Sequence, residues 1–488
     1  MLEFKPFSIN TLKEVLPYLK KNPSLCSDLS IGYLYMWHED LDIGFCVYKD
    51  TLVIKENIGE QPAFSYPIGN NVSLLIEELK EYTFANHLPL RFFAIDELTL
   101  KEIQNNKKLS PIMYAYDRKW SDYIYSFNDA LTFKGKKYSG QRNHINKFKK
   151  LYGEPNIRLL TINDKDKVME MLDEYEIEHP DSQALEKLEL ERTKKVFDNF
   201  EDLGLYSAGM FIDDKIIAFS IGEIVNNSLI IHVEKALIKY KGAYPTMYSG
   251  FTNLINEHLN ISLDKINRED DSGDMGLRTS NLQYQPIFIA HKYLVHYNSP
   301  LQKLSNIPTF SFNNIILSKI KETDKEAYLK LNTDIENNLY WGYDYRKDLT
   351  ITFPIDENTF YDSLKYDMEA GDSLNFAIRL KEDGEMIGEA IIWNLTSDGF
   401  AELGCRILPQ YQGNGYGIKA FGALEAFVSK YLKNIKVYAK CHHSNIKSFK
   451  MITANGFEPV YKDDTYYYFE KGMAKTSFIK LCPSLAFD

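Results

Sequence analysis

Hydrophobic and polar positions alternate along this chain with two periods, one typical of amphipathic helices and one typical of half-buried strands. In "FSINTLKEVLPYLKKN" and "NVSLLIEELKEYTF" apolar residues return every three or four positions, which predicts helices. In "IGFCVYKDTLVIKE" apolar and polar residues alternate on both sides of Lys49 and Asp50, which predicts a hairpin. Helices and strands are therefore mixed from the start of the chain, which favours an α/β protein.

One order of elements then occurs twice. Between residues 154 and 300, predicted helices precede the strands "LYSAGMFIDD", "KIIAFSIGEIV" and "SLIIHVEKAL", and a further helix and strand follow. From residue 313, helices precede the hairpin "NFAIRLKEDGEMIGEAIIWNL" and the strand "FAELGCRIL", again followed by a helix and a strand. The polar segment "SPLQKLSNIPTF", interrupted by proline, is typical of a linker. We therefore expect three modules, at 1–153, 154–300 and 313–472.

Length and composition narrow the class of protein. With 488 residues the chain is too long for one compact core, and 44% apolar with 26% charged residues is typical of a soluble globular protein. The net charge of −11 argues against bulk binding of nucleic acid or of an anionic membrane, although a local basic patch could still bind either. The sequence shows no signal peptide, no run of about 18 apolar residues and no Cys-x-x-Cys pair. We expect a cytoplasmic protein with reduced thiols and no membrane span.

The segment "QYQGNGYG" at 410–417 lies between a predicted strand and a predicted helix. Glycine permits positive φ and a close approach of backbone amides, and the free amides at a helix N-terminus can bind a phosphate. No Gly-Lys-Ser/Thr follows, and the preceding hairpin is antiparallel, which excludes the nucleotide P-loop and the dinucleotide fingerprint. These residues alone leave a phosphate-binding loop and an ordinary turn open.

The spacing Gln412-x-x-Gly415-x-Gly417 resembles the acetyl-CoA signature of the GNAT N-acetyltransferases. The longer stretch "ELGCRILPQYQGNGYGIKAFGAL" resembles the ribosomal-protein-acetylase branch of that family. Downstream, Asn445 and Ser448 followed by "NGF" resemble the second GNAT motif. The resemblance covers about residues 313–472 and implies an acetyl-CoA-dependent N-acetyltransferase.

The same resemblance implies where the cofactor binds. The strand before the glycine loop would separate from the next strand, and pantetheine would lie in the wedge between them. Loop amides would hold the pyrophosphate. The residues implied to bind acetyl-CoA are Ile407, Leu408, Gln412, Gly413, Asn414, Gly415, Tyr416, Gly417 and Asn445.

Amine acetylation also requires a general base, because the attacking amine must be neutral. Glu402 and Glu389 alternate with apolar neighbours on their strands, so each could face the cleft or be a solvated carboxylate on the sheet. In the GNAT fold the region of "WGYDYR" lines the acceptor pocket, although a structural aromatic cluster is equally compatible. The candidate acceptor-binding residues there are Trp341, Tyr343, Asp344 and Arg346.

The first 298 residues resemble a second family. "GKKYSGQRNHINKFKK" and "KINREDDSGDMGLRTSNLQYQPIFIAHKY" resemble the C-terminal half of phosphatidylglycerol lysyltransferases, a tandem pair of GNAT-like folds related to the Fem aminoacyl transferases. This resemblance constrains the fold more than the activity. The whole chain is thus expected to hold three GNAT-like mixed-sheet folds, α/β (α+β) in class: a tandem pair and a C-terminal acetyltransferase domain.

The second module lacks a usable glycine loop. At the equivalent place it reads "KYKGAYPTMYSG", where Tyr244 adds a side chain and Pro245 removes an N–H donor. We infer that this module has lost CoA pyrophosphate binding and carries another donor, such as an aminoacyl-tRNA end, or none. The basic stretch 134–150 could contact tRNA phosphates or be a solvated helix face.

The acidic segment "NREDDSGDMGLR" is either a substrate pocket or a loop held by salt bridges, and it lacks the spacing of an EF-hand. Its candidate substrate-binding residues are Arg268, Glu269, Asp271 and Arg278. Cys441-His442-His443 has no second ligand pair, so no metal site is predicted.

The sequence therefore favours an enzyme that acetylates an amine, whether of a small molecule, an amino acid or a peptide N-terminus, through its C-terminal domain. The N-terminal pair would perform a second transfer or recognise the acceptor. Two alternatives stay open: an aminoacyl-tRNA-dependent aminoacyltransferase centred on residues 1–298, and an N-terminal pair that only binds. Neither the acceptor nor the oligomeric state is predicted.

Overall fold

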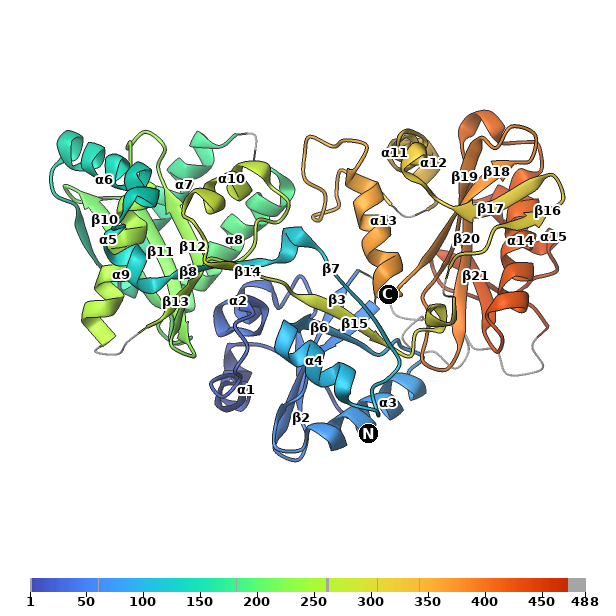
Figure 1. The fold of residues 1–488 in the computed structure, drawn as a ribbon, viewed down its shortest axis with the longest axis horizontal. Coiled ribbons are helices and arrows are strands. Elements are labelled where there is room, and N and C mark those ends of the chain that lie inside the picture. The colour runs from blue at the N-terminus through green and yellow to red at the C-terminus, as the bar shows by residue number, and fades with distance from the viewer. Residues whose placement is uncertain are drawn as a thin grey trace.

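The computed structural model describes residues 2–59, 61–180, 182–259, 263–304, 306–341 and 343–472. This part of the chain folds into three mixed β-sheets with helices packed on them (Figure 1). The blue and green regions of Figure 1 hold the first two sheets, and the orange and red region holds the third. The predicted α/β fold with three mixed sheets is confirmed. Gly342, within the aromatic motif considered above, lies outside the described residues.

The first sheet consists of β1 (Lys5–Pro6), β2 (Gly44–Val47), β3 (Thr51–Ile58), β4 (Gln61–Ser65), β5 (Ile68–Gly69), β6 (Arg91–Ile95), β7 (Ile112–Tyr116) and β15 (Tyr293–Tyr297). The order is β1-β2-β3-β4-β6-β15-β7, and β5 pairs with β3. The predicted hairpin is β2 with β3, and Lys49 and Asp50 both take positive φ in its turn.

The second sheet consists of β8 (Asp122–Ser126), β9 (Asn156–Leu159), β10 (Tyr206–Ile212), β11 (Lys215–Val225), β12 (Ser228–Ala236), β13 (Lys265–Asn267) and β14 (Phe288–Ala290). The order is β14-β8-β13-β12-β11-β10-β9. The two sheets exchange strands, because β8 precedes residue 153 and β15 follows the whole second sheet. A linear division at 153/154 does not include this exchange, which ties the two sheets together.

The third sheet consists of β16 (Phe310–Phe312), β17 (Ile315–Lys319), β18 (Leu374–Leu380), β19 (Met386–Trp393), β20 (Phe400–Ile407), β21 (Lys436–His442), β22 (Glu458–Lys462) and β23 (Tyr466–Glu470). The order is β16-β17-β18-β19-β20-β21-β23-β22. The parallel ladder between β20 and β21 runs only from Phe400 opposite Lys436 to Glu402 opposite Tyr438. Beyond Glu402 the two strands separate, as the GNAT resemblance implies.

Helices bury the apolar faces of the sheets. They are α1 (Leu12–Leu19), α2 (Ile31–Trp37), α3 (Val72–Ala85), α4 (Glu97–Asn105), α5 (Phe127–Thr132), α6 (Ser139–Tyr152), α7 (Lys165–Glu178), α8 (Ala184–Asn199), α9 (Ala243–Leu259), α10 (Met275–Gln283), α11 (Lys325–Thr333), α12 (Ile335–Asn338), α13 (Thr359–Ala370), α14 (Tyr416–Tyr431) and α15 (Ile446–Ala454). On β18, Phe376 packs with Phe427 of α14, whereas Ala377 packs with Leu364 of α13. Alternation along the strand thus puts α14 on one face and α13 on the other.

The third sheet is joined to the first through the end of α13. Asp372 accepts a hydrogen bond from Arg91 at 2.7 Å and lies 3.1 Å from the His296 ring. Ser299 donates to the carbonyl of Gly371, which has φ +81° and closes α13. A Cβ on Gly371 would come within 2.8 Å of the Met113 sulfur, so glycine permits this close contact. These contacts fix the third sheet against the first.

Candidate active-site cavity and cofactor loop

A cavity of about 1180 Å³ lies between the three sheets. Its lining includes Glu56 of β3, His232 of β12, and Glu389 and Arg406 of β19 and β20. All three sheets therefore contribute side chains to one shared cavity.

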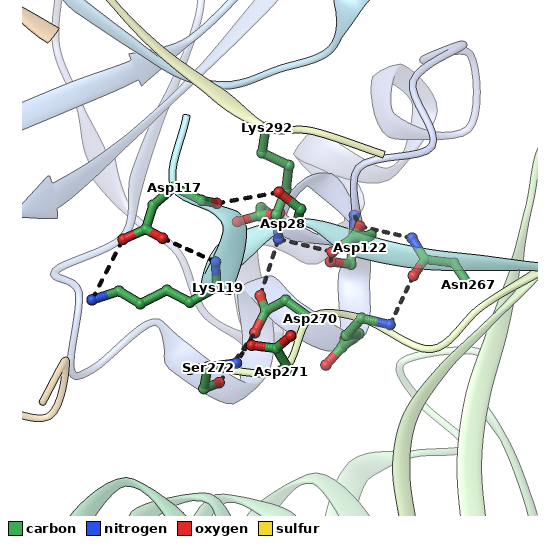
Figure 2. A network of polar contacts seen from close by, with 12 residues as sticks. Asp28, Asp117, Lys119, Asp122, Asn267, Asp270, Asp271, Ser272 and Lys292 are labelled. Carbon is green, nitrogen blue, oxygen red and sulfur yellow. Dashed lines mark hydrogen bonds and ion pairs between the residues drawn. The ribbon is translucent and has the colours of Figure 1, made fainter. Parts of the chain in front are cut away.

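A buried lysine organises the N-terminal wall of the cavity (Figure 2). Lys292 Nζ lies 2.7 Å from Asp28, 2.9 Å from Asp122 and 3.3 Å from Asp270. Burial alone would lower the pKa of Lys292, but the three carboxylates outweigh it and raise that pKa well above its usual range. Burial raises the pKa of Asp270 to about 7 despite the lysine. The cluster holds one cation among three acids, with Lys292 and Asp122 buried and Asp28 and Asp270 partly buried.

A second buried cluster is centred on His232. Its ring nitrogens lie 2.9 Å from Glu223 and 2.7 Å from Glu269, and the Gly32 amide donates to Glu223. A Cβ on Gly32 would come within 2.3 Å of the imidazole, so only glycine fits there. Burial alone would lower the pKa of His232, but its hydrogen bonds to Glu223 and Glu269 raise it to about 10. His232 is thus an imidazolium at neutral pH.

We expect His232 to stay protonated from pH 6 to pH 8.5. Because the folded pKa lies above the unfolded value of about 6.5, its contribution to stability is complete below pH 6.5 and is lost as pH rises toward 10. The measurement is histidine-labelled NMR, with the resonance assigned by its absence in His232→Gln. A titration midpoint below pH 8 for that resonance would contradict a charged His232 between Glu223 and Glu269.

Arg268 and Glu234 form a third buried pair, 3.0 Å apart, with the guanidinium over the rings of Tyr248 and Tyr284. Within the described chain, Nη1 of Arg268, Oε2 of Glu234 and Nδ2 of Asn281 are buried without a hydrogen-bond partner. All three residues line the cavity. Because an unpaired buried polar atom costs about 1–3 kcal/mol, this set suits a ligand with both an acceptor and a donor.

The remaining predicted residues of the acidic segment divide in two. Glu269 and Asp271 line the cavity, whereas Arg278 is absent from its described lining. Arg278 pairs with Asp271 at 2.7 Å, and Asp271 also accepts from Tyr123 and Arg118. Burial would raise the pKa of Asp271, but these donors lower it. Asp271 and Arg278 therefore hold the loop in place.

Of the predicted acceptor-binding residues of the third domain, two line the cavity and two do not. Trp341 and Tyr343 line the cavity, and Trp341 packs over Gly404, where a Cβ would come within 3.0 Å of the indole. Asp344 and Arg346 pair with each other 2.8 Å apart and are absent from the described lining. The aromatic side chains, rather than this ion pair, thus face the cavity.

Glu389 lies at the third-domain end of the cavity and is fully engaged. Its Oε2 accepts from Arg406 Nε at 2.9 Å, and its Oε1 accepts from Tyr328 and Asn375. Arg406 is held in turn by the side chains of two asparagines, Asn332 and Asn338. This network is buried, and it fixes the position of the Glu389 carboxyl group.

Glu402 is placed differently. It shares a face of β20 with Gly404 and Arg406, and it lies opposite Trp393 in the ladder with β19. Trp393 lines the cavity, whereas Glu402 is absent from the described lining. Glu402 accepts a hydrogen bond from Asn394 at 2.9 Å and lies 3.8 Å from Lys440.

The glycine loop presents free backbone donors. Gly413 and Gly415 take φ of +83° and +74°, and no atom lies within 4 Å of where their Cβ atoms would be. Within the described chain, the amides from Gly413 to Tyr416 have no hydrogen-bond acceptor, and α14 begins at Tyr416. Free amides and a helix N-terminus together favour an anion at this point.

Side chains around the loop fix its shape. Gln412 donates to the carbonyl of Ile407 at 3.0 Å, and Lys447 reaches Gln412 at 3.4 Å. The Leu408 amide donates to Ile387, so a role for this amide in binding pantetheine would require the ladder to open there. Asn445 caps α15 by accepting from Ser448 at 3.0 Å. Gly417 lies against the sulfur of Met451, 3.2 Å from its Cβ position.

The second module has no open loop at the equivalent place. Gly242 packs against α6, and a Cβ on it would come within 2.2 Å of the His144 carbonyl. Tyr244, two positions after Gly242, packs against the buried core of the second sheet. The backbone that could hold a pyrophosphate is therefore covered by α6, while Lys136, Lys147 and Lys150 of the basic stretch are exposed.

Several central residues were not singled out from the sequence. Lys292, Asp28, Asp122 and His232 come from segments far apart in the chain and meet only through the strand exchange of the first two sheets. The one available signal was the density of acids near residue 270.

A family model described as "Phosphatidylglycerol lysyltransferase, C-terminal" matches residues 23–296, more than half of the chain. The chain belongs to this family. A second model, "Acetyltransferase (GNAT) domain", matches residues 314–458. This member of the phosphatidylglycerol lysyltransferase C-terminal family thus carries an added GNAT domain, as the sequence motifs predict.

Three individual proteins are similar to parts of this chain. A conserved protein of unknown function from Bacteroides thetaiotaomicron is 30% identical, with a TM-score of 0.57 over 61% of this chain and 100% of that chain. An uncharacterized protein, MYCGA3080 of Mycoplasmoides gallisepticum, is 26% identical over 209 residues, 42% of this chain; the chain spans 65% of that relative's length. A spermidine N-acetyltransferase from Vibrio cholerae, in complex with CoA and spermine, is 14% identical over 32% of this chain and 96% of that chain, with a TM-score of 0.29.

Three further features bear on the class of protein. In the described ranges no helix has the length and apolar character needed to cross a bilayer. Cys26, Cys46, Cys405 and Cys441 are free thiols. No group of three or more His, Cys, Asp or Glu side chains in the described part of the chain is arranged to hold a metal ion.

Proposed function

We propose that the C-terminal domain transfers an acetyl group from acetyl-CoA to an amine that enters from the shared cavity. The observation that carries this proposal is the separation of β20 from β21 beside a loop with free amides. The loop would hold the pyrophosphate through the amides from Gly413 to Gly417, with Lys447 adding positive charge. The pantetheine arm would lie in the wedge near Ile407 and Asn445.

The chemistry then follows from the residues on the acceptor face. The neutral amine attacks the thioester carbonyl, the new C–N bond forms, the C–S bond breaks, and CoA leaves as the thiol. Glu402 is the proposed base, receiving the proton of the amine through water. Glu389 is less suited, because Arg406, Tyr328 and Asn375 occupy its oxygens, and its proposed role is to hold the sheet and orient the amine.

We expect acetyl-CoA to raise the melting temperature of the full chain, and an amine to release CoA from it. A dissociation constant one hundred times below the acetyl-CoA concentration would add about 2.7 kcal/mol to stability. Thermal shift and a thiol assay with an amino-acid amide, a polyamine and a peptide amine measure both. Glu402→Gln should lower kcat more than Glu389→Gln at equal cofactor affinity. No shift and no thiol release would reject the proposal.

The N-terminal pair has features that favour a second reaction, the transfer of an aminoacyl group. The unpaired atoms of Arg268, Glu234 and Asn281 in the cavity suit the carbonyl and amine of an aminoacyl group. Family membership supports the same chemistry, and the exposed lysines of residues 134–150 would contact the phosphates of a tRNA donor.

A further inference from the structure

The acetyltransferase domain supplies part of the wall of the N-terminal cavity. Thr352 donates to the carbonyl of Ser272 at 3.0 Å, and Lys119 donates to the carbonyl of Thr350 at 3.2 Å. Gln183 exchanges two hydrogen bonds with the backbone of Phe353. The segment that carries Tyr343 therefore contacts the acidic segment of the N-terminal pair, and the two centres open into one volume.

The charges lining this volume favour a cationic occupant. Among the described lining residues, carboxylates outnumber lysines and arginines by more than two to one. One of them, Glu56, is 4% exposed and has an oxygen with no hydrogen-bond partner in the described chain. A buried, unpaired carboxyl group in a cavity is a site that a bound donor, such as an ammonium group, would satisfy.

Asp367 lies where the two halves of the cavity meet. It belongs to α13, which packs on β7 of the first sheet and on α11 of the third domain. The charged groups that interact with it are Asp372, Asp117, Lys119 and Arg91. The charge of Asp367 also contributes to raising the pKa of Tyr328. Burial and Asp372 raise the pKa of Asp367 to about 7, so a cation bound beside it would stabilise its charged form.

We propose that both centres act on one ligand: an amino-acid derivative held by the N-terminal pair presents its amine, through the shared cavity, to the acetyltransferase domain. Asp367 and Glu56 bind the cationic end of this ligand. This inference rests on the proposed acetyl transfer and names the class of its acceptor.

The reaction balances without a further reactant. The ammonium of the ligand loses one proton to solvent or to Glu402, and its nitrogen then forms the C–N bond with the thioester carbonyl carbon. The C–S bond breaks, a second proton passes from the nitrogen to the sulfur, and CoA departs as the thiol. The product is an N-acetylated aminoacyl group, uncharged at that nitrogen. Because the cavity is acidic, loss of this positive charge would weaken binding and favour release.

The test uses the full chain, acetyl-CoA and lysinamide, whose carboxamide replaces the ester of an aminoacyl donor. Asp367→Asn and Glu56→Gln keep side-chain shape and replace one carboxyl group each with an amide, in the third domain and in the N-terminal pair. Asp362→Asn is the matched control, because Asp362 is an exposed residue of the same helix and is absent from the described lining of the cavity.

We expect each cavity variant to raise the KM for lysinamide about tenfold, with the affinity for acetyl-CoA within twofold of the parent, and the control to change neither. Mass spectrometry should find one acetyl group on one amine. If acetyl-CoA binds and other amines are acetylated, but both variants leave the lysinamide KM unchanged, the shared-ligand proposal fails and the proposed function stands. If acetyl-CoA does not bind, both fail.

Discussion

Replacing Gly415 with tryptophan should raise the dissociation constant for acetyl-CoA at least a hundredfold, or about 2.8 kcal/mol. The residue lies between free amides at the start of α14, with open space where a side chain would project. A large ring there would occupy the place of the pyrophosphate. Isothermal titration with acetyl-CoA on the full chain measures the effect.

Gly384→Trp is the control for this experiment. Gly384 also has positive φ, +75°, and also has no atom within 4 Å of its Cβ position, but it lies in the turn between β18 and β19. The two substitutions therefore carry a similar backbone strain of about 1–2 kcal/mol. Equal affinity for acetyl-CoA in both variants would show that the loop does not hold the cofactor.

Replacing Lys292 with methionine should destabilise the N-terminal pair by about 3–5 kcal/mol, because it leaves Asp28, Asp122 and Asp270 as mutually repelling buried carboxylates. Urea unfolding measures the difference. The loss should be smaller at pH 5.5 than at pH 8, because Asp28 and Asp270 already have raised pKa values and accept protons readily once the lysine is gone.

Lys194→Met provides the comparison. Lys194 forms an exposed ion pair with Asp173 at 2.9 Å, and such pairs contribute about 0–1 kcal/mol. A loss for Lys292→Met no larger than that of Lys194→Met would mean that the buried cluster does not stabilise the fold. A large loss without any pH dependence would point to packing rather than charge as the cause.

The position of Lys292 also explains why the N-terminal pair is one unit. Lys292 directly precedes β15, which belongs to the first sheet, while its partner Asp122 begins β8 of the second. The ion pair therefore closes the strand exchange beside the N-terminal wall of the cavity. Asn267 of the neighbouring strand β13 donates to the same aspartate at 2.8 Å, which extends the link further across the second sheet (Figure 2).

The sequence by itself determined the local elements and the glycine loop. Alternation around Lys49 and Asp50 predicted a hairpin, and the glycine spacing from Gln412 to Gly417 predicted a strand, loop and helix, because these patterns depend on neighbouring residues only. Tyr244 and Pro245 similarly indicated that the second module lacks such a loop.

Only the tertiary structure decided which side chains meet. The strand exchange brings Asp28, Asp122 and Lys292 together over long separations in sequence, and no local pattern encodes that pairing. The tertiary structure also showed that Arg406 binds Glu389 and that Asp344 pairs with Arg346 away from the cavity. Periodicity gives the face on which a side chain lies, but its partners and its exposure to a shared cavity depend on how separate sheets pack.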